Sequence, residues 1–179
     1  MKPNPRQDTV RRFFAGLTEY AFGCRLGVVD PPLVDYLAEL LVRFIRNDDV
    51  FSVRGPTGKR LDQVADMLLE AEARQGEARR KVHRHIGDFT LFWCGVYPEV
   101  FERMRRLGRK DALLDYQTQG KRAYYIASTI AVESEPPRPA VLQRLSDDFE
   151  MCVFGLGEVR REWERRGGDS DPAWPLLIN

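Results

Sequence analysis

Apolar residues recur every three or four positions along most of the chain, which is the spacing that places them on one face of an α-helix. The clearest pattern covers residues 33–45. Its apolar positions are Leu33, Leu37, Leu40, Leu41, Phe44 and Ile45. Asp30 can cap the start of this helix, and Pro31 fits its first turn, where a missing N–H is tolerated. The pattern therefore predicts a helix over 33–45 with Asp30 as its N-cap.

The same periodicity predicts three further long helices, over 61–92, 112–130 and 140–163. Two shorter helices are expected near 9–25 and 98–107, the first capped by Asp8. Stretches rich in glycine and proline separate these segments, and only 51–53 has the pattern of a short extended segment. About six helices joined by short loops predict an all-α, antiparallel helical bundle. Leu40, Leu68, Phe89, Leu145 and Phe149 are expected in its core.

The chain of 179 residues has the length of one domain with a sizeable core. We therefore expect a single helical domain over 1–179. Residues 1–8 are expected to form an N-terminal arm. Residues 167–179, "GGDSDPAWPLLIN", are expected to form an extended tail.

Composition narrows the classes of protein that fit. Hydrophobic residues make up 43% and charged residues 31%, a balance typical of folded rather than disordered chains. The formal net charge of +1 argues against a nucleic-acid-binding protein, which is usually far more basic. No apolar run approaches the length of about 18 residues that a membrane span needs, and we find no signal peptide. These features predict a soluble protein.

The cysteines and the arginine bias bear on location and source. Cys24, Cys94 and Cys152 are odd in number, far apart and each within an apolar segment, which favours free thiols in a reducing compartment such as the cytoplasm. Arginine accounts for most of the 28 basic residues, while isoleucine and asparagine are scarce. This bias is typical of a GC-rich genome and predicts a bacterial source.

Both histidines lie in the stretch "KVHRHIGDFTLFWCG", residues 81–95. On a helix, His83 and His85 would point roughly 200° apart, so they are poorly placed to share one metal ion. No HExxH or CxxC pattern occurs in the sequence. We therefore expect neither a metal site nor a cofactor.

His85 and Asp88 are the best candidates for catalytic residues. They are three residues apart at the edge of the apolar stripe, so a helix brings them within reach of each other. A carboxylate beside an imidazole orients the ring and raises its pKa, which prepares a general base. The alternative is a partly buried histidine whose N–H is satisfied by Asp88. Either way, we expect the helix to continue through Gly87 and Asp88.

A second unusual stretch is "DYQTQGKRAYYIAS", in which small residues line one helix face beside tyrosines. Small residues let a neighbouring helix or a flat ligand approach closely. Lys121, Tyr124 and Tyr125 would then supply polar groups to a ligand. Ordinary helix packing is the alternative explanation of the same pattern.

Two functional hypotheses follow, since no motif reaches the specificity of a catalytic signature. The first is a soluble bacterial module that binds a protein partner or a small ligand. The second is a small enzyme or ligand-binding domain whose pocket uses His85, Asp88 and Tyr124 or Tyr125. A membrane is not an expected partner, and the oligomeric state stays open, a homodimer included. The two hypotheses differ in whether these side chains face a shared cavity or are closed within packing.

Overall fold

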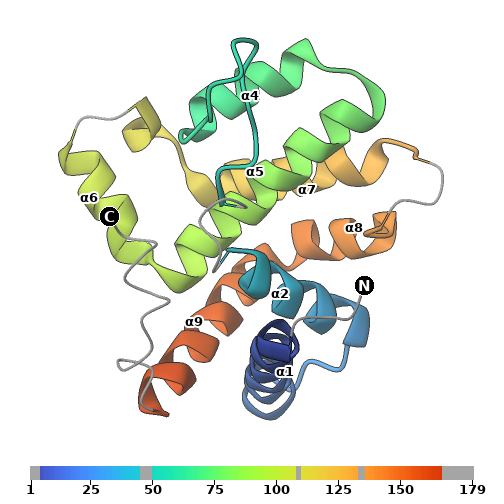
Figure 1. Cartoon of the computed structure of the whole chain (residues 1–179), viewed down its shortest axis with the longest axis vertical. Coiled ribbons are helices and arrows are strands. Elements are labelled where there is room, and N and C mark those ends of the chain that lie inside the picture. The colour runs from blue at the N-terminus through green and yellow to red at the C-terminus, as the bar shows by residue number, and fades with distance from the viewer. Residues whose placement is uncertain (1–4, 45–49, 108–109, 133–135, 167–179) are drawn as a thin grey trace. The chain divides into compact units, whose positions relative to one another are not determined.

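The computed structural model describes residues 5–44, 50–107, 110–132 and 136–166, and every regular element within these ranges is helical (Figure 1). The α-helices are α1 (Pro5–Glu19), α2 (Pro31–Phe44), α4 (Val64–Ala73), α5 (Gly76–Val96), α6 (Pro98–Arg106), α7 (Tyr116–Thr129), α8 (Pro139–Asp147) and α9 (Phe149–Arg165). A π-helix, η1 (Tyr20–Arg25), follows α1, and a 3-10 helix, η2 (Lys110–Leu113), precedes α7. The predicted all-α class is confirmed. Across these ranges, no helix combines the length and hydropathy that crossing a bilayer requires.

The chain divides into two compact units, with one boundary between residues 50 and 51 and the other within α9. The terminal unit consists of residues 1–50 and 154–179, and the central unit consists of residues 51–153. The expectation of one domain over 1–179 stays a prediction. The predicted tail over 167–179 lies outside the described residues, as do residues 1–4 of the predicted arm, while residues 5–8 belong to α1.

The terminal unit is built on the packing of α1 against α2. Its core contains Leu17, Leu33 and Leu40, none of which is accessible to solvent. The start of α2 is the one expected from the sequence, because the Asp30 carboxylate accepts the backbone N–H of Leu33 at 3.2 Å. Local capping chemistry and apolar periodicity therefore suffice to define this helix.

Helix α5 is the centre of the central unit and contacts α4, α6 and α7, while α7 also contacts α8 (Figure 1). Fourteen of its 21 residues are buried, so neighbours surround most of its circumference. Glycines make the α5–α7 contact close. A Cβ atom at Gly87 would lie 2.7 Å from the ring of Tyr124, and one at Gly120 would overlap Thr90 and Phe149. The small-residue face of α7 therefore serves helix packing.

The long helix predicted over 61–92 is wrong, because the structure divides it into α4 and α5. Arg74 and Gln75 have extended backbone angles, with ψ near 159° and 160°, and Gly76 has a φ of +55° that favours glycine. The apolar spacing continues across this break and so conceals it. As a result Leu68, predicted to be buried, is half-exposed, and its neighbour Met67 takes the core position.

The helix predicted over 140–163 is also two helices, α8 and α9, which meet at a break at Asp148. The predicted cap of the first helix differs as well, and the helix within 112–130 has a cap of its own. Helix α1 begins at Pro5, so Asp8 lies in its first turn. Helix α7 is capped by Asp115, whose Oδ1 accepts the N–H groups of Gln117 and Thr118 at 3.0 and 3.3 Å.

Asp111, one residue before the predicted helix over 112–130, caps a helix that is distant in the sequence. Its buried carboxylate accepts the N–H groups of Val64 and Ala65, the first residues of α4, at 2.7 and 3.0 Å. It also accepts the hydroxyl of Tyr116 at 2.7 Å. One carboxylate therefore links the start of α4 to the segment that leads into α7.

Leu40 offers a test of the predicted core face. We expect Leu40→Ala to lower the free energy of unfolding by about 2–5 kcal/mol, because it removes buried apolar surface and leaves a cavity. Val29→Ala is the matched control in the same unit: its side chain is 91% exposed, so the change should stay within about 0.5 kcal/mol. Urea denaturation measures both. Equal effects of the two substitutions would show that Leu40 is not a core residue.

Candidate functional site

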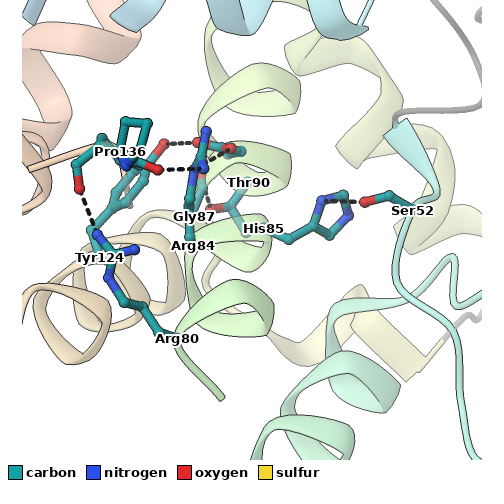
Figure 2. Close-up of polar contacts among 10 residues, drawn as sticks. Ser52, Arg80, Arg84, His85, Gly87, Thr90, Tyr124 and Pro136 are labelled. Atoms are coloured by element: carbon teal, nitrogen blue, oxygen red, sulfur yellow. Dashed lines mark hydrogen bonds and ion pairs between the residues drawn. The ribbon is translucent and has the colours of Figure 1, made fainter. Parts of the chain in front are cut away.

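His85 and Asp88, the predicted pair, both lie on α5 but form hydrogen bonds with different partners. His85 Nδ1 lies 3.1 Å from the hydroxyl of Ser52, on the loop that precedes α4. Asp88 Oδ1 accepts the hydroxyl of Tyr124 at 2.7 Å. Figure 2 shows His85 and Tyr124 on opposite sides of α5. A coupling between His85 and Asp88 stays a prediction.

The Asp88–Tyr124 pair is enclosed by side chains. Asp88 is 1% exposed and Tyr124 is fully buried, with its ring against Gly87. The Arg84 guanidinium lies 3.8 Å from the other oxygen of Asp88. Burial of a carboxylate is tolerated when hydrogen bonds and a nearby cation compensate for its lost hydration. This geometry favours the interpretation of the pair as part of the helix interface.

The other predicted ligand residues are not gathered around that pair. Tyr125 is 53% exposed, whereas its neighbour Tyr124 is buried. Lys121 forms an exposed ion pair with Glu150, with 2.8 Å between Nζ and Oε1. A binding role for Lys121, Tyr124 and Tyr125 stays a prediction.

Two arginines of α5 hold the stretch that leads into α8 (Figure 2). Buried Arg80 donates to the carbonyl of Pro137 at 2.5 Å, and Arg84 donates to the carbonyl of Pro136 at 3.4 Å. Both bonds satisfy backbone carbonyl groups that lie outside the helices, so the two arginines have a structural role here. Among the described residues, no group of three or more His, Cys, Asp and Glu side chains is arranged to hold a metal ion.

His83 is buried on α5 and has a strongly altered titration. Burial lowers its pKa to about 4, and the positive charge of Arg79 acts in the same direction. Glu72 opposes this shift, and Arg122 adds to it. Arg79 Nε also donates to His83 Nε2 at 3.5 Å. His83 is therefore neutral at pH 7, and its ring is a packed side chain rather than a charged ligand-binding group.

The terminal unit contains a cleft that the sequence analysis missed. Its volume is about 270 Å³. The lining residues are Tyr20, Ala21 and Arg25 of η1 and Glu158, Arg161, Glu162 and Arg165 of α9. We refer to it as the η1–α9 cleft. It carries three arginines and two glutamates, so its lining has a net positive charge.

The π-helical geometry of η1 positions one wall of this cleft. In an α-helix, residues five apart point about 140° away from each other. A π-turn closes between residues i and i+5, as the bond from the Leu26 N–H to the Ala21 carbonyl does at 3.2 Å, and so brings such residues nearly into line. Accordingly, the Arg25 guanidinium lies 5.8 Å from the centre of the Tyr20 ring.

Two glycines allow η1 to take this place. A Cβ atom at Gly155 of α9 would overlap the ring of buried Phe22, so only glycine lets that ring pack there. Gly27 has a φ of +69°, and the N–H of Val28 returns to the carbonyl of Phe22 at 2.9 Å. The π-helix is thus fixed against α9 on one side and closed at its end.

Ion pairs already engage both carboxylates of the η1–α9 cleft. Buried Glu162 accepts Arg165 at 2.6 and 2.9 Å and Arg166 at 2.7 Å. The hydrogen bonds from Arg165 and then from Arg166 lower the pKa of Glu162 to about 2, and Glu162 raises the pKa of Arg165. Glu158 pairs with Arg161. Within the described ranges, no carboxylate forms an ion pair with Arg25, whose described contact is the Tyr20 ring.

No protein-family model, curated protein or solved structure matches this chain. Function must therefore be inferred from its own residues. The η1–α9 cleft offers cations, an aromatic ring and two carboxylates that are held as acceptors of arginine. Such groups can bind and orient a polar ligand.

His83 gives a test of the electrostatics of α5. Because its pKa in the folded state lies below the ordinary value of 6.5, the unfolded chain takes up a proton first as the pH falls. Its contribution to stability is complete above pH 6.5 and is lost as the pH falls toward 4. From pH 7 to pH 5 the wild type should lose about 2 kcal/mol more than His83→Gln.

Urea denaturation at both pH values measures this difference, and the exposed, non-titrating substitution Val29→Ala is the control. That variant should keep the pH dependence of the wild type. If His83→Gln kept the same dependence, His83 would titrate normally in the folded protein.

Proposed function

We propose that this chain is a binding module for a small ligand and that the η1–α9 cleft is its binding site. The cleft itself is the observation that supports this proposal most. Its volume of about 270 Å³ lies just below the range of about 300–1,000 Å³ typical of ligand pockets, so the ligand is small. Its wall is a π-helix, a rare element that is frequent at functional sites.

We also propose that the module is soluble and acts in the cytoplasm of a bacterium. Three free cysteines support a reducing compartment, and Cys24 in particular is exposed. The arginine bias of the sequence supports the bacterial source. Neither a protein partner nor a second copy of the chain is needed to complete the cleft, because all seven lining residues belong to one unit.

The test is a fragment screen read by two-dimensional NMR. Fragments that bind should shift the amide signals of η1 and of the α9 residues that line the cleft. Tyr20→Ser removes the aromatic wall and should weaken such fragments about tenfold or more. Tyr125→Ser is the matched control, since it removes an exposed tyrosine outside the cleft and should leave affinity unchanged. Fragments that depend on Tyr125 instead, or that shift only the central unit, would contradict the proposal.

A second candidate function is an enzyme, favoured by one contact. The Ser52 hydroxyl lies 3.1 Å from His85 Nδ1, which is within reach for a nucleophile and its base. Ser52 is exposed and His85 is buried, so a reagent could approach the hydroxyl. Because Asp88 and Tyr124 are enclosed in the α5–α7 contact, the enzyme hypothesis rests on Ser52 and His85 instead.

A fluorophosphonate probe separates the two functions. In the enzyme hypothesis, Ser52 Oγ forms a bond to phosphorus, the phosphorus–fluorine bond breaks, fluoride leaves, and the hydroxyl proton passes to His85. Mass spectrometry should then find label on Ser52 in the wild type and in the control Ser128→Ala, and none in His85→Gln. The binding proposal expects Ser52 to stay unlabelled in all three proteins.

A further inference from the structure

We propose that the η1–α9 cleft takes a small carboxylate carrying a single negative charge, held by the guanidinium of Arg25. This inference rests on the proposed function, since it names the class of ligand for the same cleft. It is based on which of the arginines that line the cleft already form ion pairs with glutamates and which one does not.

The arginines of the cleft differ in what they already bind. Arg161 and Arg165 come from α9 and are paired with Glu158 and Glu162. Arg25 comes from η1 and stacks with Tyr20 rather than with a carboxylate of the described residues. Its planar fork of donors can accept a carboxylate in a bidentate manner. The N–H groups of Arg25 are therefore the donors in the cleft that can bind an incoming anion.

The stacking of Arg25 also prepares it for binding. A free arginine side chain loses rotamer freedom when it captures an anion, which weakens affinity. Contact between the guanidinium and the Tyr20 ring, 5.8 Å from the ring centre, restricts that freedom before a ligand arrives. The π-turn enforces this contact because it aligns residues five apart.

The pairing of the charged groups favours a carboxylate as the ligand. Arg161 pairs with Glu158, and Arg165 shares Glu162 with Arg166, so the carboxylates of the lining are already compensated. Among the lining arginines, Arg25 is the one without a carboxylate partner in the described residues, and one carboxylate balances its charge. A cation is disfavoured, because Glu162 would have to leave three hydrogen bonds with Arg165 and Arg166 to accept it.

The volume limits the rest of the ligand. About 270 Å³ equals the volume of roughly nine water molecules in the liquid. Benzoate, with nine non-hydrogen atoms, is a suitable probe, and its ring can contact the exposed part of Tyr20. Benzamide has the same shape without the charge, and benzylammonium carries the opposite charge.

The experiment titrates the full chain with benzoate, benzamide, benzylammonium and inorganic phosphate, followed by NMR. We expect benzoate to shift the amide signals of η1, to bind at least tenfold more tightly than benzamide, and to weaken as salt is added. Arg25→Gln should lower benzoate affinity about tenfold or more. Arg103→Gln is the matched control, because it removes an exposed arginine of α6 outside the cleft. NMR spectra of both variants check that they fold.

Each other outcome has a defined meaning. If benzamide bound as tightly as benzoate, or if Arg25→Gln bound benzoate like Arg103→Gln, the cleft would not select an anion through Arg25. If benzylammonium or phosphate bound in the cleft more tightly than benzoate, the charge class would be wrong while the binding proposal stood. If neither these probes nor any screened fragment shifted η1, both the inference and the proposed function would fail.

Discussion

The close approach of α5 and α7 is the constraint on which the central unit depends. Gly87 and Gly120 remove the side chains that would hold the two helices apart, and the Tyr124 ring fills the space. That approach buries the carboxylate of Asp88, which would be costly without a donor. The Tyr124 hydroxyl is that donor, so the glycines and the polar pair form one arrangement. The remaining helices of the unit pack around α5 or α7.

The sequence predicted the elements whose determinants lie within a few turns of each other. The α2 helix with its Asp30 cap, the continuity of α5 through Gly87, and the burial of Leu40 and Phe89 all follow from local spacing. The breaks at 74–76 and at Asp148 were missed because the apolar period continues across them. The cap from Asp111 to Val64 was missed because it spans 47 residues, and no local pattern marks it.

The candidate site depends even more on contacts between residues far apart in the sequence, which local patterns do not reveal. The chain has only two histidines, which made them candidates for a site, yet the hydrogen bond described for His85 is with Ser52, 33 residues away. The η1–α9 cleft depends on a π-turn between Tyr20 and Arg25 and on a glycine in a helix far along the chain. By α-helical spacing, these two residues point in different directions. The alternating glutamates and arginines of α9 look like an ordinary solvated face, so only the fold brings these groups together.

The π-turn also determines how many residues can separate Tyr20 from Arg25 in a chain that keeps their contact. A turn closed between i and i+5 holds one residue more than a turn closed between i and i+4. A descendant that lost one residue between Tyr20 and Arg25 would place the tyrosine and the arginine four residues apart, and a regular α-helix puts such residues on one face. A descendant that kept all six residues but formed a regular α-helix would turn the two side chains about 140° apart. The contact between the tyrosine and the arginine therefore persists among relatives only where the length of this segment and its type of turn change together.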